Sequence, residues 1–133
     1  MKTVFVDTSG LYAALDPTDP YHREALEAFR RAEDERWHLL TTRFVVVEVW
    51  ALVQSRKGWD SVDVLLNGLL PRCEVVEVDP RLHELGAARC RQARSRWLSL
   101  TGGVSLEFMQ SNGIREAIVA DRDFAAAGIR HPA

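Results

Sequence analysis

The stretch TVFVDTSGLYAAL, residues 3–15, carries an apolar run, an aspartate and a helix-forming segment in direct succession. Residues 3–6 have the length and composition of a short buried strand. Residues 9–15 predict a short helix, so Asp7 stands between the end of the strand and the start of the helix. The rest of the chain can be interpreted from this unit of a strand followed by a helix.

The same alternation continues along the sequence. Residues 43–58 are ambiguous because four valines favour β structure, but their length and the closing Gly58 favour a helix. Alternating strands and helices predict parallel βαβ units with right-handed crossovers, and therefore an α/β fold with helices on both faces of the sheet. Further strands are expected at 37–42, 73–79 and 116–121, and further helices at 20–36, 43–58, 61–70, 80–94, 99–113 and 122–128.

Composition limits the class of protein. The 133 residues are 47% hydrophobic and 27% charged, which predicts one globular domain spanning 1–133. The net charge of −2 excludes a protein that binds nucleic acid through bulk positive charge alone. Cys73 and Cys90 are too few for a disulfide framework or a zinc site. Apolar runs are too short for a secretory signal or a membrane span, so we expect a cytoplasmic protein.

Three acidic residues stand where the predicted fold can bring them together. Asp7 and Asp121 each end an apolar strand run, at the edge of the sheet where such folds bind ligands. Glu48 interrupts FVVVEVWALV, residues 44–53, the most apolar run of the chain. Taken singly, the aspartates are equally suited to capping helices, and Glu48 to a solvent-facing position. Convergence of all three requires a hard divalent cation, Mg²⁺ or Mn²⁺, and indicates metal-assisted phosphoryl chemistry.

Two other α/β families that use such acids do not match the sequence. A phosphatase of the haloacid dehalogenase type needs a second aspartate two residues after the first, but the chain has Asp7-Thr8-Ser9. A phospho-receiver domain needs a lysine at a later strand end, and neither Lys2 nor Lys57 can serve.

Three blocks of the sequence resemble a PIN-domain nuclease, in particular a VapC-type toxin of toxin–antitoxin systems. They are VFVDTSGLYAALDPTDPYHREALEAF at 4–29, LTTRFVVVEVWALV at 40–53 and LSLTGGVSLEFMQSNGIREAIVADRDFAAAGI at 98–129. The resemblance implies a three-layer α/β/α sandwich with a parallel sheet of about five strands. It also implies a Mg²⁺- or Mn²⁺-dependent endoribonuclease that forms a homodimer and binds a small antitoxin protein.

The family holds its metal with a quartet of acids. The resemblance assigns the first to Asp7, the second to Glu48 and the fourth to Asp121, which are therefore the expected catalytic residues and metal ligands. The third acid of the family follows Leu-Thr at the head of the penultimate helix, where this chain has Gly102 and then Gly103. Because glycine costs roughly 1 kcal/mol against alanine in a helix, the fold alone is not expected to select this pair.

The glycine at position 102 leaves several explanations open. They are natural loss of activity, an inactivating substitution and a divergent site with a substitute ligand. The alternative function is a catalytically silent PIN-fold protein that binds RNA or an antitoxin. Asp123 is a candidate auxiliary metal ligand. Candidates to contact substrate or water are Thr8, Ser9 and Ser105, although helix capping explains the first two equally well.

Arginines and apolar residues suggest further contacts. In ARCRQARSRW, residues 88–97, Arg89 and Arg96 lie near one another at helical spacing and can guide phosphates of RNA to the site. A solvated helix face with ion pairs explains this row equally well. Trp97 is expected in the core or at a dimer contact, with base stacking as the alternative. The helices expected at 43–56 and 60–70 hold more apolar side chains than one sheet face needs. The residues expected to cover a neighbouring subunit are Val62, Val64, Leu65, Leu66, Leu69 and Leu70.

Overall fold

The structure, a computed structural model, describes residues 1–120 and 122–132, apart from the side chains at 122 and 123. Parallel strands form one sheet in the order β3-β2-β1-β4. In the described region no helix is long and apolar enough to cross a membrane. The strands are β1 (Thr3–Val6), β2 (His38–Thr42), β3 (Cys73–Val76) and β4 (Ala117–Ile118), and the helices are α1 (Thr8–Leu15), α2 (His22–Asp34), α3 (Arg43–Arg56), α4 (Trp59–Val64), the π-helical η1 (Leu65–Leu69), the 3₁₀-helical η2 (Leu70–Arg72), α5 (Pro80–Ala93), α6 (Leu100–Ser111) and α7 (Arg122–Ala126).

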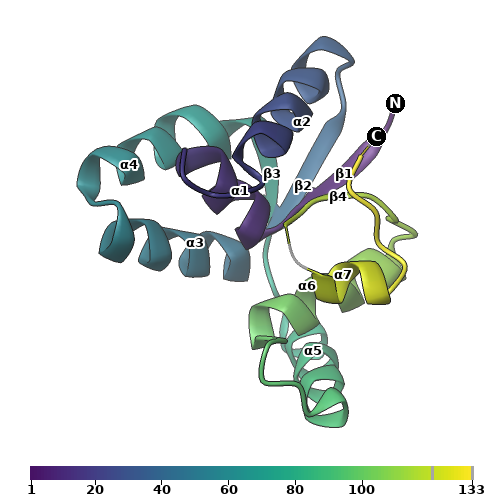
Figure 1. The fold of residues 1–133 in the computed structure, drawn as a ribbon. Coiled ribbons are helices and arrows are strands. Elements are labelled where there is room, and N and C mark those ends of the chain that lie inside the picture. Colours follow the sequence, from purple (N-terminus) through teal and green to yellow (C-terminus); the bar gives the residue numbers. More distant parts are fainter. Residues whose placement is uncertain (121, 133) are drawn as a thin grey trace.

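Helices cover both faces of the sheet, which confirms the expected three-layer sandwich. Helices α1, α2, α3 and α4 lie on one side of the strands, and α6 and α7 lie on the other (Figure 1). The topology explains this division. The right-handed crossovers from β1 to β2 and from β2 to β3 run in the same direction, so their helices share a face. The crossover from β3 to β4 runs back across the sheet and places its helices on the opposite face.

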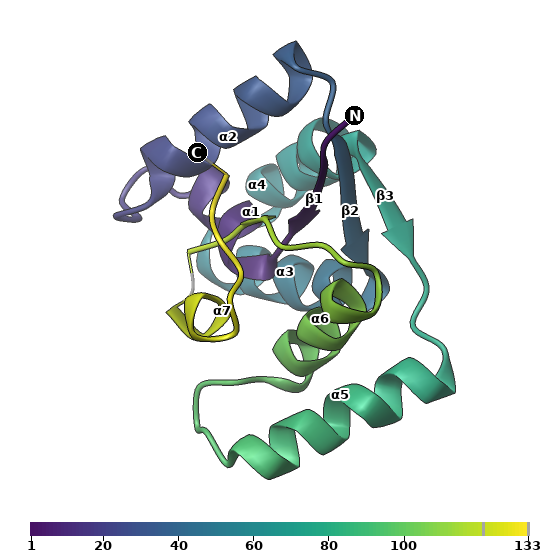
Figure 2. The same cartoon turned by 90° about the vertical axis from the view of Figure 1, so that its right-hand side faces the viewer.

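Helix α5 stands apart from the two helical layers. It lies beyond the carboxyl ends of the strands and packs chiefly against α6 (Figure 2). Among the residues of α5, only Gly86 is fully buried. The α5–α6 pair therefore projects from the end of the sheet at which we expect the functional site.

The sheet has slightly fewer strands than expected. The strands expected at 73–79 and 116–121 are shorter, since β3 ends at Val76 and β4 covers only Ala117–Ile118. A single parallel bridge joins Glu116 and Arg130 beyond β4. In the described part of the chain, this bridge is all that corresponds to a fifth strand.

Residues 43–56 form a helix despite their valines. Thr42 ends β2 and caps α3, since its hydroxyl accepts a hydrogen bond from the N–H of Val45 at 3.4 Å. Val45, Val49 and Val53 recur at four-residue spacing and are fully buried. Burial of this apolar stripe outweighs the weak β preference of valine, which confirms the predicted helix.

The apolar residues of 61–70 contribute to the core more than expected. Val62 and Leu65 are fully buried and Leu69 is 9% exposed, so the expectation that they cover a neighbouring subunit is wrong for these three. They pack within the core because α4 continues into η1 beneath α3 and α1. Val64, in contrast, is 53% exposed.

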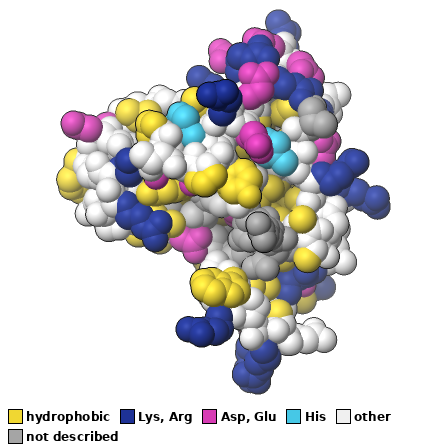
Figure 3. Space-filling model, viewed as in Figure 1, with side chains coloured by type: hydrophobic (Ala, Val, Ile, Leu, Met, Phe, Trp, Pro, Cys, Tyr) yellow, Lys and Arg dark blue, Asp and Glu magenta, His cyan; other side chains and the backbone are white. Residues whose placement is uncertain are grey.

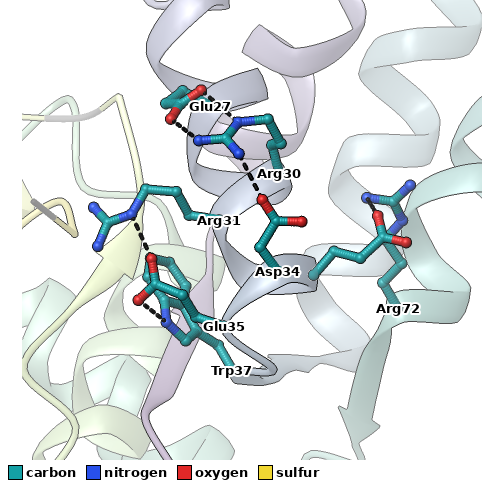
Figure 4. Close-up of polar contacts among 8 residues, drawn as sticks. Glu27, Arg30, Arg31, Asp34, Glu35, Trp37 and Arg72 are labelled. Carbon is teal, nitrogen blue, oxygen red and sulfur yellow. Dashed lines mark hydrogen bonds and ion pairs between the residues drawn. The ribbon is translucent and has the colours of Figure 1, made fainter.

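Helix α2 carries its charge on its outer face, where ion pairs neutralise it (Figure 4). Arg30 pairs with Glu27 and, at 2.6 Å, with Asp34. The Nε of Arg31 lies 3.0 Å from Oε2 of Glu35. Exposed pairs of this kind contribute little to stability.

Candidate active site

Asp7 occupies the corner between β1 and α1, and its side chain is only 4% exposed. Its carboxylate caps α1, with Oδ2 accepting hydrogen bonds from the N–H of Ser9 at 3.1 Å and from the Ser9 hydroxyl at 2.6 Å. The sequence left two roles open for Asp7, capping of a helix and binding of a ligand. The cap leaves the carboxylate buried and held at the carboxyl end of the central strands, so it does not exclude ligand binding.

The ends of β1 and β4 are joined at this corner. The N–H of Asp7 donates to the carbonyl of Ile118 at 3.1 Å, and the N–H of Ala120 donates to the Ser9 hydroxyl at 2.9 Å. The chain is therefore held beside Asp7 up to Ala120. Two predicted ligands follow directly, but Asp121 and the side chain of Asp123 lie outside the described residues.

Glu48 lies on α3, the helix that packs against α1 and α6. It is half-buried, between the buried stripe of Val45 and Val49 and the exposed Val47. Within the described residues, Glu48 has no hydrogen-bond or ion-pair partner. Its carboxylate is therefore available to bind a cation.

The head of α6 explains one of its two glycines. A Cβ on Gly103 would lie 2.5 Å from Sγ of Cys90 and 2.6 Å from the carbonyl oxygen of Gly86, so α5 packs too closely for a side chain there. The expectation that the fold does not select this pair is therefore wrong for Gly103. A Cβ on Gly102 would meet Cδ1 of Leu98 at 3.0 Å and Oγ of Ser99 at 3.5 Å. Because Leu98 is a flexible side chain, packing alone does not require a glycine at 102.

Two buried hydroxyls near these elements lack a partner in the described structure. They are Oγ1 of Thr8, on a residue 6% exposed, and Oγ of Ser105, on a fully buried residue. Thr8 follows Asp7 in the first turn of α1, and Ser105 lies one turn beyond Gly102 on α6. Buried hydroxyls are normally hydrogen-bonded, so both are candidates to bind a water or ligand.

The donor set is compatible with a hard divalent cation. The described residues contain no cluster of three or more histidine, cysteine or acidic side chains that could hold a metal. Mg²⁺ is nevertheless held in many sites by one or two carboxylates with waters. Asp7, Glu48 and the two orphaned hydroxyls offer only oxygen donors, which are the ligands that Mg²⁺ and Mn²⁺ prefer.

The predicted arginine row divides into paired and unpaired members. Arg89 donates through Nε to Oε1 of Glu107 at 3.0 Å and through Nη2 to Gln110, so its charge is engaged within the α5–α6 pair. Arg96 is exposed and has no ion-pair partner in the region described. Trp97 is 80% exposed, so the expectation of a core position is wrong.

Sequence reasoning missed two features of this corner. Ser9 was considered for capping or for contact with substrate, but its link to Ala120 was not foreseen because strand adjacency depends on topology. The contact of α5 with Gly103 was missed for the same reason. The signal available in the sequence was the pair of small residues at Gly86 and Cys90, one helical turn apart.

The comparisons with known proteins agree with this geometry. The family model described as PIN domain matches residues 4–129. No curated protein matches the chain. A solved structure of Mycobacterium tuberculosis VapC20, described as a toxin that cleaves the sarcin–ricin loop, is 26% identical with a TM-score of 0.81 and 95% coverage of both chains.

Two more distant structures share the fold. FitAcB from Neisseria gonorrhoeae is 13% identical with a TM-score of 0.66, over 97% of this chain and 96% of that one. VapBC2 from Rickettsia felis, bound to a DNA fragment from its promoter, is 12% identical with a TM-score of 0.68 over 97% of each chain. With a family match over nearly the whole sequence and a structure that superposes on these proteins, the chain belongs to the PIN domain family.

Proposed function

We propose that this chain is a VapC-type toxin whose domain, residues 1–133, cleaves RNA with the help of Mg²⁺ or Mn²⁺, and that Gly102 weakens this activity. The observation that carries the proposal is the buried carboxylate of Asp7, which Ser9 fixes beside the end of β4. The similarity to VapC20, which cleaves the sarcin–ricin loop, supports a structured RNA as the class of substrate.

In this proposal Asp7, Glu48 and Asp121 hold the metal, and Asp123 serves as an auxiliary ligand. When bound, a divalent ion activates water for attack on phosphorus and neutralises charge on the phosphodiester. Asp7 contributes a carboxylate whose rotamer is fixed by Ser9, so its orientation does not depend on the metal. Orientation of this kind supports catalysis because reacting groups must be held within a fraction of an ångström.

Two buried hydroxyls would complete the polar lining of the proposed metal site. Thr8 and Ser105 have buried hydroxyls that can each donate a hydrogen bond to a water or a phosphate oxygen. Ser9 keeps a structural role, since its hydroxyl already donates to Asp7 and accepts from Ala120. Arg89 likewise supports the α5–α6 pair through Glu107 rather than contacting RNA.

Gly102 reduces the number of carboxylates by one at the head of α6. Fewer negative charges repel each other less in the absence of metal, but they also attract cations less strongly. We expect at most one divalent ion, bound more weakly than in a full quartet. The second candidate function follows from the same observation: a catalytically silent PIN-fold protein that still binds RNA or an antitoxin.

The exposed surface of α3 is the proposed site of homodimerisation. An apolar groove of about 600 Å³ is lined by Val46, Val47, Trp50 and Ala51. Val47 is 63% exposed, and Trp59 beside the groove is 57% exposed. The ring of Trp59 packs edge-on against that of Trp50, with 6.3 Å between the ring centroids. Contiguous exposed apolar side chains of this kind mark protein interfaces. A cytoplasmic antitoxin protein, as in VapBC complexes, is the other proposed partner.

Restoring the acid tests the proposal. In the Gly102→Asp variant, a small shift of the flexible Leu98 side chain relieves its 3.0 Å contact with the new Cβ, and we expect RNA cleavage to rise by roughly 10- to 100-fold in Mn²⁺. Calorimetric titration with Mn²⁺ should show tighter binding in the same variant. The matched control is Gly102→Asn, which has the same shape without the charge.

The outcomes separate the two functions. A gain in cleavage with Asp that is absent with Asn, and that is abolished by adding Asp7→Asn, supports the nuclease. Equal inactivity of the Asp and Asn variants, without a change in Mn²⁺ affinity, would contradict the nuclease and favour the silent PIN-fold protein. Cleavage that persists in excess EDTA would contradict the metal dependence.

A further inference from the structure

The loop between α5 and α6, residues 94–99, carries the most exposed tryptophan of the described chain. Trp97 is 80% exposed, whereas Trp37 is 8% exposed and Trp50 and Trp59 pack against one another. A fully exposed indole forgoes a large burial energy, since aromatic side chains are among the largest apolar surfaces of a protein. Its position at the tip of the α5–α6 pair makes it available to a ligand.

Local contacts hold this loop in one conformation. Arg94 ends α5 in the left-handed region at φ 52°, and its N–H donates to the carbonyl of Cys90 at 3.1 Å. The N–H of Trp97 donates to Oγ of Ser95 at 3.1 Å. The Cys90 thiol donates to the carbonyl of Ser99 at 3.1 Å. A loop fixed at both ends loses little conformational entropy on binding.

The loop is also a local concentration of unpaired positive charge. Arg91, Arg94 and Arg96 are exposed, and none has a carboxylate within ion-pair distance among the residues described. On the face seen in Figure 3, a hydrophobic patch lies at the lower end of the molecule, and Lys and Arg side chains lie directly below it. The arginines that pair with acids elsewhere are Arg30, Arg31, Arg43, Arg72 and Arg89.

The loop adjoins the corner of the candidate active site. Leu98 follows Trp97 directly, and its Cδ1 lies 3.0 Å from the position of a Cβ at Gly102. Ser99, the next residue, caps α6 through the N–H of Gly102 at 3.0 Å. A ligand on Trp97 would therefore lie close to the helix that carries Gly102, because only Leu98 and Ser99 separate Trp97 from the first residue of α6.

We propose that Trp97 stacks on an unpaired base of the RNA substrate while Arg94 and Arg96 bind its phosphates. The proposal rests on the proposed function in that it names part of the same substrate site. An exposed π surface flanked by arginines that have no ion-pair partner among the described residues complements a nucleic acid, which offers both a base face and negative phosphates. A protein partner of similar chemistry would need an acidic segment, and that possibility is an outcome of the test.

The experiment measures RNA binding by the unaltered chain in EDTA, so that neither metal nor cleavage is required. The probes are a fluorescein-labelled hairpin with an unpaired loop and a fully paired duplex of the same length, followed by fluorescence anisotropy. We expect Trp97→Ala to weaken hairpin binding about 10-fold, the effect of losing one stacked base, and to leave duplex binding nearly unchanged. Trp97→Phe, which keeps an aromatic face, should restore most of the affinity.

Loss of the arginines should change RNA binding in a different way from loss of Trp97. Arg94→Gln combined with Arg96→Gln should weaken binding to both RNAs and reduce the slope of log affinity against log salt by about 1.4, the value for two lost phosphate contacts on a single strand. Matched controls are Tyr21→Ala and the pair Arg23→Gln with Arg36→Gln, which alter exposed side chains far from both the loop and the α3 groove. These controls should bind like the unaltered chain.

Several results would overturn the inference. They are unchanged hairpin affinity in Trp97→Ala, an equal loss on hairpin and duplex, or no binding of either RNA by the unaltered chain. A fall in oligomeric mass caused by Trp97→Ala would assign the side chain to a protein contact instead. Failure of Gly102→Asp to restore cleavage, with intact binding through Trp97, would reject the nuclease while leaving the RNA contact in place.

Discussion

The hydroxyl of Ser9 lies 2.6 Å from Oδ2 of Asp7, and through it the carboxyl ends of β1 and β4 are connected. The same hydroxyl accepts the N–H of Ala120 at 2.9 Å, so one side chain orients the first acid and fixes the chain that leads to the last. Ser9 and Ala120 are 111 positions apart in the sequence, and they meet because β1 and β4 are neighbours in the parallel sheet.

Replacing this hydroxyl should loosen the whole corner. Ser9→Ala leaves the N–H of Ala120 without its acceptor and removes one donor from the buried carboxylate of Asp7. An unsatisfied buried group costs about 1–3 kcal/mol, so urea unfolding should show a loss of that size. Ser111→Ala, which removes an exposed hydroxyl at the end of α6 away from the α3 groove, is the control and should change stability by less than about 0.5 kcal/mol. Equal effects of the two substitutions would contradict the proposed link.

The adjacent glycines of α6 should respond oppositely to alanine. Gly103→Ala forces its methyl group against Cys90 and the carbonyl of Gly86, and such overpacking costs about 1–3 kcal/mol. Gly102→Ala meets only the end of the Leu98 side chain, so the gain in helix propensity should raise stability by up to about 1 kcal/mol. Thermal unfolding of the two variants measures the difference. A destabilisation of equal size in both would show that the corner excludes side chains generally.

The strand and helix order was predictable from the sequence because periodicity is a local property. The β1–α1 unit around Asp7 and the helical state of the valine-rich residues 43–56 are confirmed. What the sequence could not give was the distance between segments. Gly103 was attributed to function together with Gly102, because the close approach of Gly86 depends on how α5 packs on α6.

The sequence also predicted where two of the candidate metal ligands lie, while their role as ligands stays a prediction. Asp7 lies at the strand end as expected, and Glu48 is half-buried on the helix that packs beside it. The burial of individual side chains was harder to predict from the sequence, because it depends on which faces of a helix or strand other elements cover. Trp97 was expected in the core or at a dimer contact and is 80% exposed, while Val62 was expected to cover a neighbouring subunit and is fully buried.

Asp16 should make stability depend on pH. Its pKa is lowered from 3.8 to about 2, mainly by hydrogen bonds from the Thr18 hydroxyl and backbone N–H, with Lys57 adding at 3.3 Å. A carboxyl group whose pKa is lower in the folded state stabilises the protein above its unfolded pKa, and this contribution is lost as the pH falls from about 4 to 2. The stability difference between the unaltered chain and Asp16→Asn should therefore narrow over that range.

Urea unfolding at constant ionic strength between pH 5 and pH 2.5 measures this difference. Thr18→Val removes the hydroxyl that donates to Asp16, so it should raise the pKa of Asp16 and move the loss of its stabilising contribution to higher pH. An NMR titration of the Asp16 carboxyl group reports the same shift directly. A stability difference that stays constant from pH 5 to pH 2.5 would show that the folded state does not favour the ionised carboxylate.

The groove on α3 predicts how the chain assembles. Val47 is 63% exposed and lines the groove with Trp50, so Val47→Glu places a charge in the centre of the proposed dimer contact. Burying that charge is strongly unfavourable, and the variant should have half the mass of the unaltered chain in analytical ultracentrifugation. Because the side chain is exposed in one protomer, the free energy of unfolding of the protomer should fall by less than about 0.5 kcal/mol.

The matched control is Leu26→Glu on α2, where a leucine is 45% exposed away from the groove, and this variant should remain dimeric. Equal masses for Val47→Glu and the unaltered chain would place the dimer contact on another surface.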